Sequence, residues 1–324
     1  MQRRRLLQAA LAAAALPAAF PAIVRAQAWP ARPIRFIVPY IPGSAPDVLA
    51  RTLAERLTTA LGQTIVIENR GGAGGNIGTE LIAKAPADGY TIGLATSAVS
   101  TNPWLYRKVG YDPLTDFTYV NMSTAMPHLL VVAADAPQRS TADLVRALKE
   151  APGKLNYASG GNGSGAHLAG ELFKGLAAVD AVHVPFKGAP DIVNSVISKT
   201  TNFGFPTLVT AVPLVRAGRL RALAVTGTRR NHALPEVPAV ADAVPGYELM
   251  SWFGIIGPAG MPAEAVRRLD AELTRALAEP AFRDRLQADG SEVVNLGSTD
   301  FAARFKADYP KSRRMVELSG AKLD

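Results

Sequence analysis

The chain has 324 residues, 48% of them hydrophobic, with a formal net charge of +8 and no cysteine. The lack of cysteine excludes a disulfide framework and thiol chemistry, and the four histidines (128, 167, 183 and 232) lack metal-ligand spacing, so we expect no metal site. Lysines and arginines beyond residue 28 are scattered in ones and twos, which argues against a nucleic-acid partner and suits a small anion better.

The first 28 residues have the pattern of an export signal. Arginines at positions 3–5 precede a long run of alanine and leucine, which ends in an Ala-Gln-Ala sequence typical of signal-peptidase sites. We therefore expect cleavage after Ala28 and a periplasmic protein. The arginines followed by two leucines also fit a twin-arginine signal, so the export route stays open. A membrane anchor over residues 6–24 is disfavoured, because alanine is weakly apolar and Pro17 and Pro21 interrupt the run.

Strand-like and helix-like segments alternate along the rest of the chain. Such alternation predicts βαβ units and an α/β fold with mainly parallel sheets flanked by helices. The predicted strands are residues 34–38, 64–69, 91–96, 128–134, 155–159, 181–186, 201–205, 220–227 and 251–258. The predicted helices are residues 46–61, 77–84, 140–150, 165–176, 189–198, 208–218, 262–278, 280–288 and 298–318.

The length of the chain favours two domains, yet no change of composition marks a linker between them. We therefore expect a chain that crosses into a second domain and returns. Domain 1 is predicted to comprise residues 29–127 plus 252–324, and domain 2 residues 128–251. Because ligands of open α/β sheets sit beyond the carboxyl ends of the strands, two facing sheets would form one cleft.

The turn YIPGSAPD, residues 40–47, joins the first predicted strand to the first predicted helix. If Pro46 is the first helical residue, the amides of Asp47 and Val48 point out of the helix start, next to those of residues 43–45. Unpaired amides and the positive end of a helix dipole form a seat for an anion. The alternative is an ordinary turn in which Asp47 caps its own helix.

A second glycine-rich turn of this kind lies within residues 157–173. It offers hydroxyls at Ser159 and Ser164, the side-chain amide of Asn162 and a row of backbone donors. Two such loops, one in each domain, could grip a carboxylate from both sides. His167 falls inside the predicted helix, where packing or capping is favoured over ligand contact.

Motifs for a cofactor or for catalysis are missing. The glycines of residues 69–78 read G-x-G-x-x-x-G, which differs from the dinucleotide fingerprint, and no Walker lysine follows. Ser164 has Asn162 where a nucleophile elbow needs glycine, and no spacing brings an acid, a base and a nucleophile together. We therefore expect no cofactor and no enzymatic activity.

The chain resembles the TctC or Bug family, the periplasmic solute receptors of tripartite tricarboxylate transporters, across almost the whole length beyond residue 28. The matching stretches occur in the family's order: IRFIVPYIPGSAPDVLAR, LGQTIVIENRGGAGGNIG, ADGYTIGLAT, APGKLNYASGGNGSGAHLAGELF, HVPFKGAPD, AGRLRALAVTGTRR, PEVPAVADAVPGYE and WFGIIGPAGMP.

This resemblance implies a type II-like periplasmic binding protein, in which two α/β domains close on a small organic anion, usually a carboxylate. It also implies membrane permease subunits as partners, and we expect a monomer because a hinge must move freely. Carried over by position, the ligand-binding residues are Tyr40, Pro42, Gly43, Ser44, Ala45, Asp47, Thr96, Ser97, Ala98, Ser159, Gly160, Asn162, Ser164, Ala166, His167, Phe186, Lys187, Gly188, Pro206 and Thr207.

The chain departs from the family pattern at several positions. The usual first loop reads aromatic-Pro-Pro-Gly-Gly-x-x-Asp, whereas Ile41 and Ser44 replace a proline and a glycine here, and Pro46 removes an amide. Ser44 could supply a hydroxyl in compensation. Lys199 and Asn202 stand where the family has glycine and aspartate, which puts the turn geometry there in doubt. Lys187 and Lys199, as single lysines, fit solvated surface better than an anion site.

Three functional classes follow from these features. A transport receptor predicts binding without turnover and a permease partner, and the motifs favour it. A sensor module that signals to a membrane histidine kinase would have the same fold, and the sequence does not separate the two. A periplasmic enzyme is disfavoured by the missing catalytic residues. Which ligand binds stays open among aliphatic dicarboxylates, tricarboxylates, aromatic acids, acidic amino acids and uncharged compounds.

Overall fold

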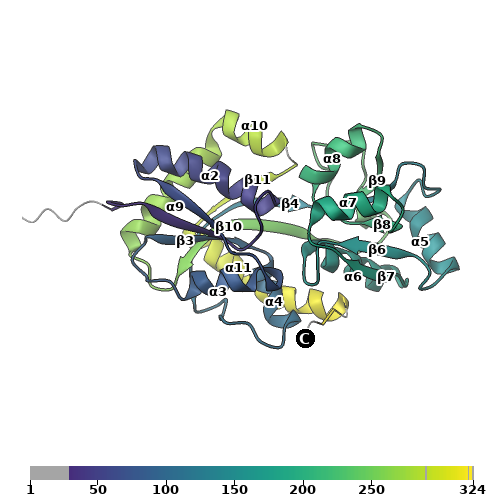
Figure 1. Cartoon of the computed structure of the whole chain (residues 1–324), viewed down its shortest axis with the longest axis horizontal. Coiled ribbons are helices and arrows are strands. Elements are labelled where there is room, and N and C mark those ends of the chain that lie inside the picture. The colour runs from purple at the N-terminus through teal and green to yellow at the C-terminus, as the bar shows by residue number, and fades with distance from the viewer. Residues whose placement is uncertain (1–28, 289, 320, 323–324) are drawn as a thin grey trace, which may run out of the picture.

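The computed structural model describes residues 29–322 with the exception of residues 289 and 320. The predicted signal segment, residues 1–28, lies outside the described residues, so its cleavage stays a prediction. The described chain forms two lobes, each built around one β-sheet with helices packed against it (Figure 1). Within the described part of the chain, no helix combines the length and apolar character that a membrane crossing requires.

The first lobe contains a six-stranded sheet in the order β11-β4-β10-β3-β1-β2. Its strands are β1 (Ile34–Val38), β2 (Ile65–Asn69), β3 (Thr91–Thr96), β4 (Phe117–Pro127), β10 (Met250–Pro258) and β11 (Glu292–Gly297). The helices of this lobe are α2 (Ala45–Leu61), α3 (Asn76–Ala83), α4 (Ala98–Leu105), α9 (Ala263–Ala278), α10 (Pro280–Ala288) and α11 (Ser298–Ser319), with a short 3-10 turn η2 (Ala73–Gly75) before α3.

The second lobe contains a five-stranded sheet in the order β7-β6-β8-β5-β9. Its strands are β5 (Leu129–Ala133), β6 (Asn156–Ser159), β7 (Val182–Pro185), β8 (Phe203–Gly204) and β9 (Leu220–Val225). The helices of this lobe are α5 (Thr141–Glu150), α6 (Gly165–Ala177), α7 (Ala189–Ile197) and α8 (Leu208–Arg216), with a 3-10 turn η3 (Val240–Asp242) before the return to the first lobe.

The predicted α/β class with two sheets is confirmed, but the sheets are mixed and not mainly parallel. Strand β1 pairs in parallel with β2 and β3, and β6 pairs in parallel with β7 and β8. All other pairs are antiparallel: β10 pairs with β3 and β4, β11 pairs with β4, and β5 pairs with β8 and β9. The chain enters the second lobe along β4 and returns along β10, so these two neighbouring strands must run in opposite directions.

Two connections carry the chain between the lobes, and both meet at His128. Strand β4 continues through His128 directly into β5, and β10 pairs with β4 from Met250 opposite Pro127 onward. The buried His128 ring places Nδ1 2.9 Å from the Phe205 carbonyl oxygen and Nε2 2.9 Å from Ser251 Oγ. This ring therefore links the two crossing strands to Phe205, the residue directly after β8. The exact domain boundaries stay a prediction.

The lobes also touch away from the crossing strands. The first half of α11 packs Phe301 and Phe305 on the first lobe, with ring centroids 4.9 and 4.6 Å from that of Tyr119. Its last part places Val316 in a buried apolar cluster with residues of α6. A second contact joins the segment after β9 in the second lobe to the segment before β11 in the first: Asn231 Nδ2 donates to the carbonyl oxygen of Gly290 at 3.1 Å. A change of the angle between the lobes must rearrange these contacts.

Candidate functional site

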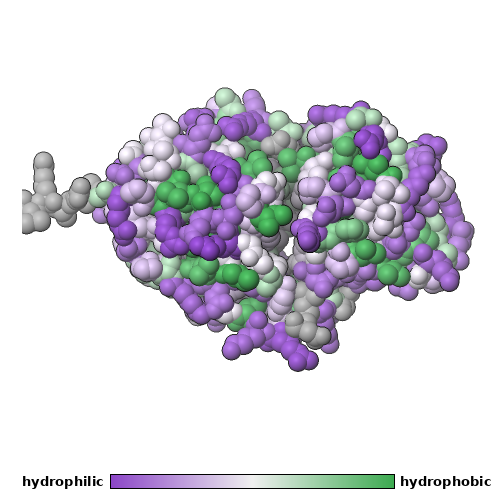
Figure 2. All heavy atoms as spheres, in the orientation of Figure 1, coloured by the Kyte–Doolittle hydropathy of each residue, from purple (hydrophilic) through white to green (hydrophobic). Residues whose placement is uncertain are grey.

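Helices α2 and α4 begin directly after the parallel strands β1 and β3, and α6, α7 and α8 follow β6, β7 and β8. Since parallel strands end at the same edge of a sheet, the helix starts of each lobe gather at one edge, and their amides point away from the helices. In the space-filling view a hollow separates the two lobes (Figure 2). The predicted site residues of both loops are placed at these helix starts.

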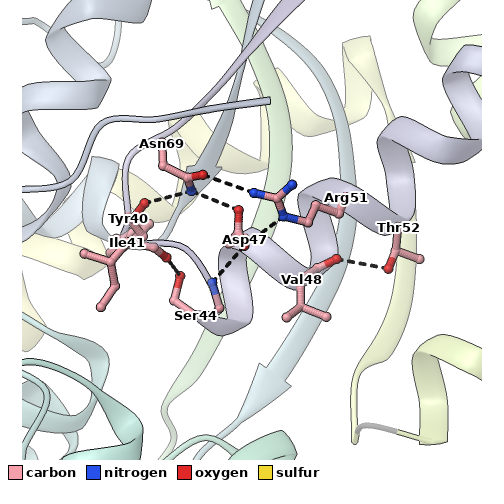
Figure 3. A network of polar contacts seen from close by, with 9 residues as sticks. Tyr40, Ile41, Ser44, Asp47, Val48, Arg51, Thr52 and Asn69 are labelled. Carbon is pink, nitrogen blue, oxygen red and sulfur yellow. Dashed lines mark hydrogen bonds and ion pairs between the residues drawn. The ribbon is translucent and has the colours of Figure 1, made fainter. Parts of the chain in front are cut away.

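Asp47 holds the first loop in shape. Its carboxylate is only 2% exposed and accepts hydrogen bonds from the Gly43 amide (2.8 Å), Arg51 Nε (3.0 Å) and Asn69 Nδ2 (2.8 Å), as Figure 3 shows. Burial raises the pKa of this carboxyl, but the hydrogen bonds from Arg51, Gly43 and Asn69 more than offset it, so the pKa lies below its usual range. Because both oxygens are occupied, these contacts favour the capping interpretation over direct contact with a ligand.

Asn69 joins the network from the end of β2. Besides Asp47, its Nδ2 donates to the carbonyl oxygen of Tyr40 at 3.0 Å, and its Oδ1 accepts from Arg51 Nη2 at 3.2 Å. One amide side chain thus links the loop, the helix and the neighbouring strand (Figure 3). Asn69 was not among the predicted site residues, because its partners lie 18 to 29 positions away in sequence.

Helix α2 begins one residue earlier than predicted. Ser44 is the N-cap and Pro46 the second helical residue, so the expectation that Pro46 opens the helix was wrong. The Ser44 amide donates to the Ile41 carbonyl oxygen at 3.3 Å, and the Val48 amide donates to the Ser44 carbonyl oxygen at 3.0 Å. Among the described residues, the amides of Ala45 and Asp47 have no acceptor. Two of the five predicted donors therefore remain open to an anion.

The Ser44 hydroxyl also serves the loop. It donates to the Ile41 carbonyl oxygen at 2.7 Å, so its hydrogen is not aimed at a ligand in this conformation. Nearby, Tyr40 Oη lies 2.8 Å from Thr96 Oγ1, which accepts from the Ala98 amide at 3.2 Å. These contacts bring the start of α4, with Ser97 as its N-cap, beside the first loop.

The second loop is held from the side of α6 by His167. The His167 Nδ1 accepts from the Gly163 amide at 3.1 Å, and Ser164, the N-cap, accepts from the His167 amide through its Oγ at 3.2 Å. These contacts favour the capping interpretation of His167 over ligand contact. The amides of Gly165 and Ala166 have no acceptor within the described part of the chain.

The two loops have the same local geometry, although their sequences differ. Gly43 and Gly163 both lie in the left-handed region, with φ of 77° and 76°, and each donates its amide to a side chain four residues later. That acceptor is the carboxylate of Asp47 in one lobe and the imidazole of His167 in the other. In both loops the serine N-cap donates its amide three residues back. Each lobe thus presents a helix start with two open amides.

The remaining predicted residues of the second lobe lie at the same edge of its sheet. The Phe186 amide donates to the Ser159 carbonyl oxygen at 2.9 Å, and a Cβ on Gly160 would lie 3.5 Å from the Cα of Gly188, the N-cap of α7. Lys187 is exposed, and its amide lies 3.4 Å from Asp191 Oδ2. Residues 206–207 lie at the start of α8, and Asn162 lies in the turn before α6.

A narrow apolar recess of about 30 Å³ lies between the lobes. That volume holds one or two waters. Among the predicted site residues it contains only Ala45, so it lies beside the first helix start and not across the whole site. The recess is lined by Ala45, Val48, Leu49 and Thr52 of α2, Met126 and Phe253 of the crossing strands, Val209 of α8, and Leu286 and Ser291.

The two departures in the second lobe lie in a turn next to β8. Lys199 Nζ pairs with Asp135 Oδ2 at 2.6 Å, and both side chains are more than 60% exposed, as expected for surface lysine. Asn202 and Asn156 exchange hydrogen bonds: each side-chain Oδ1 accepts the other's backbone amide, at 2.8 and 2.9 Å. Asn202 therefore aligns β6 with β8. Across the described residues, no group of acidic or histidine side chains could hold a metal ion.

Comparison with known proteins identifies what the chain is similar to. The family model described as "Tripartite tricarboxylate transporter family receptor" matches residues 49–320. A curated relative from Pseudomonas sp. (strain P51), the UPF0065 protein in the tcbD-tcbE intergenic region, is 35% identical over 294 residues, which cover 90% of this chain and 88% of the relative.

Solved structures agree with this match. The R. palustris protein Rpa4515 with adipate is 36% identical and superimposes with a TM-score of 0.86, covering 91% of this chain and 100% of that one. MatC from Rhodopseudomonas palustris with bound malate is 29% identical, with a TM-score of 0.82 and coverage of 89% and 100%.

Proposed function

Because this chain belongs to the tripartite tricarboxylate transporter receptor family, we propose that it is a periplasmic receptor whose two lobes close on a small organic carboxylate. The family is one of substrate-binding receptors, and two similar proteins were solved with adipate and with malate. The partner proposed on the membrane side is the permease of such a transporter. The ligand-binding residues predicted from the sequence belong to this proposal.

The observation that carries the proposal is the pair of equivalent helix starts. Among the described residues, open amides at Ala45 and Asp47 in one lobe and at Gly165 and Ala166 in the other have no acceptor of their own. Four donors at the positive ends of two helices favour a bound anion without a charged side chain. A carboxylate has two oxygens, each with two lone-pair directions, so one group can accept from both lobes.

Closure follows from binding to both lobes. A ligand that contacts α2 and α6 together has a higher affinity for a state in which their starts approach, so it shifts the population toward that state. Because α11 and the contact of Asn231 with Gly290 also join the lobes, closure must move these contacts as well. Small-angle scattering should show compaction when a ligand binds, and unchanged scattering at saturating ligand would contradict this step.

The first experiment is a thermal-shift screen of residues 29–324, purified and refolded to remove any bound ligand. The panel should include adipate, malate, tricarboxylates, aromatic acids and acidic amino acids, with dimethyl adipate as the matched uncharged control. A ligand at about one hundred times its Kd adds about 2.7 kcal/mol, which raises the unfolding midpoint by several degrees. A shift by acids and not by the ester supports the proposal, whereas no shift by any acid, or an equal shift by the ester, overturns it.

A further inference from the structure

The second binding loop rests on a stack of three aromatic rings. His183, on β7, lies between Tyr157 of β6 and His167 of α6, with ring centroids 4.9 and 4.1 Å away and interplanar angles of 25° and 19°. Tyr157 and His183 are direct neighbours in the parallel pairing of β6 with β7. The ring of His183 is therefore fixed on both faces, so its nitrogens point in set directions.

One edge of this stack contacts the glycine turn. His183 Nε2 lies 2.6 Å from Ser159 Oγ, and Ser159 Oγ accepts from the Gly161 amide at 3.2 Å. The neighbouring ring, His167, accepts from the Gly163 amide. The two stacked histidines thus hold the turn on both sides of Asn162. Gly161 and Gly163 have positive φ values of 111° and 76°, and glycine has a wide choice of conformations, so such a turn needs contacts from outside to stay ordered.

The contact with the Gly163 amide requires the imidazole of His167 to be neutral, whereas the contact of His183 Nε2 with Ser159 Oγ can form with either atom as the donor. Nδ1 of His167 accepts a hydrogen bond, so its proton is on Nε2; a protonated ring would set an N–H against the Gly163 amide. The titratable groups facing the stack are Tyr157 on β6, and Glu171 and Lys174 on α6, with Tyr157 Oη donating to Glu171 Oε1 at 2.5 Å. Burial, reinforced by His167 and Lys174, lowers the pKa of His183 to about 4, and burial likewise lowers the pKa of His167.

We propose that His183 is a positioning residue for the ligand site: through Ser159 it sets the glycine turn so that the open amides at the start of α6 face the anion. This inference rests on the proposed function, because the amides matter only if an anion binds there. Neither the sequence motifs nor the helix starts drew attention to His183. Its role comes from its place on β7, the strand paired with β6, from which its side chain contacts Ser159 at the end of β6.

Two substitutions separate packing from positioning. His183→Phe keeps a ring in the stack but loses the nitrogen that faces Ser159 Oγ. His183→Gln places an amide group near the position of Nε2 and restores the contact without a ring that can titrate. His232→Gln is the matched control, because His232 is exposed and contacts the carbonyl oxygen of Gln287, which belongs neither to the ring stack nor to the glycine turn. Ser159→Ala is a second test that leaves the stack intact, for use if His183→Phe does not fold.

The first readout is the amide–water exchange rate of Gly161 and Gly163, measured by NMR without ligand. We expect at least a tenfold faster exchange at Gly161 in His183→Phe and in Ser159→Ala, and a change within twofold in His183→Gln and His232→Gln. Nitrogen chemical shifts at pH 7 should show both rings neutral, with the Nε2–H tautomer at His167. Unchanged exchange at Gly161 in His183→Phe would overturn the positioning role.

The second readout is affinity, with adipate as the first probe and the strongest acid of the thermal-shift panel as the second. Affinity should fall about tenfold in His183→Phe and stay within twofold in His183→Gln. An equal loss in both variants would mean that only the aromatic packing matters, and it would refute the proposal. If the wild-type protein binds no acid, the proposed function fails, whereas the exchange rates still decide whether His183 orders the loop.

Discussion

Substituting Asp47 with asparagine tests how the first loop is built. The side chain keeps its size and one acceptor oxygen, but the charge is lost and an NH2 group replaces the other oxygen. If the remaining oxygen stays with Gly43 and Arg51, the new NH2 faces Asn69 Nδ2, which is itself a donor. Turning the Asn69 amide around would break its bond to the Tyr40 carbonyl oxygen and its contact with Arg51. The network therefore has no arrangement that satisfies every group.

The expected cost follows from these contacts. A hydrogen bond to a charged group contributes about 1.5–3 kcal/mol, and an unpaired buried donor costs about 1–3 kcal/mol. We expect Asp47→Asn to lower the free energy of unfolding by about 3 kcal/mol at pH 7. Because the pKa of Asp47 is lowered in the folded state, the carboxylate stabilises the fold at pH values above its unfolded pKa. That contribution disappears as the pH falls through the folded pKa, so the wild-type protein and the variant should converge in acid.

Urea denaturation followed by circular dichroism measures this difference, provided that the m-value is the same in both proteins. Asp135→Asn is the matched control, since it also removes one charge from an ion pair, but at the exposed Lys199. The control should unfold at the wild-type midpoint. A wild-type midpoint for Asp47→Asn would refute the structural role of the carboxylate. If Asp47→Asn unfolded at the wild-type midpoint but lost affinity for the acid found in the screen, Asp47 would be a direct ligand contact.

Three further substitutions test the hinge and the two helix starts. Burial lowers the pKa of His128 to about 4, below its unfolded value of about 6.5, so the folded state loses stability as the pH falls from the unfolded pKa to the folded one. At pH 4.5 urea titrations should show a loss of about 2–3 kcal/mol from this residue. The variant His128→Gln should lack this pH-dependent loss. Equal pH dependence of the two proteins would contradict it. Ala166 is the second residue of α6, the position that Pro46 occupies in α2. Ala166→Pro therefore removes an open amide at a position that tolerates proline, and stability should change by under about 1 kcal/mol. Calorimetry should show that the affinity for the bound acid falls at least about tenfold. Pro46→Ala adds the matching amide to α2 and should tighten binding severalfold; weaker binding would show that this amide does not face the ligand.

Much of the fold was predictable because the signals are local. Ser140 begins α5 as its N-cap, accepting the Asp143 amide at 3.1 Å, and Gly62 ends α2 in a left-handed conformation. Strand β4 was missed because Asn121, Ser123 and Thr124 break the apolar alternation that marks a strand. All three are fully buried, and Asn121 Nδ2 donates to Asp270 Oδ1 at 3.0 Å. A partner 149 residues away is invisible to any local pattern.

Of the candidate site, the local turns could be predicted from the sequence. The serine, glycine and proline residues that start α2 and α6 are adjacent in sequence, so the two helix starts were predicted as donor-rich turns, although the start of α2 was placed one residue too late, at Pro46. The residues that hold these turns come from neighbouring strands. Asn69 ends β2 and His183 lies on β7, and nothing in the spacing of the sequence relates them to the loops they contact.

The equivalence of the two loops bears on how the receptor selects its ligand. Each loop fixes its glycine with a side-chain acceptor, but Asp47 is charged and neutralised by Arg51, whereas His167 is neutral and stacked on His183. Neither arrangement leaves a net charge at the helix start, so the attraction for an anion comes from oriented amides. Each neutral amide donor contributes less than a charge-assisted hydrogen bond from an arginine. In the proposed receptor, selectivity among carboxylates would then arise from the shape of the closed site, and Ile41, Ser44 and Pro46, which depart from the family pattern, lie on one side of it only.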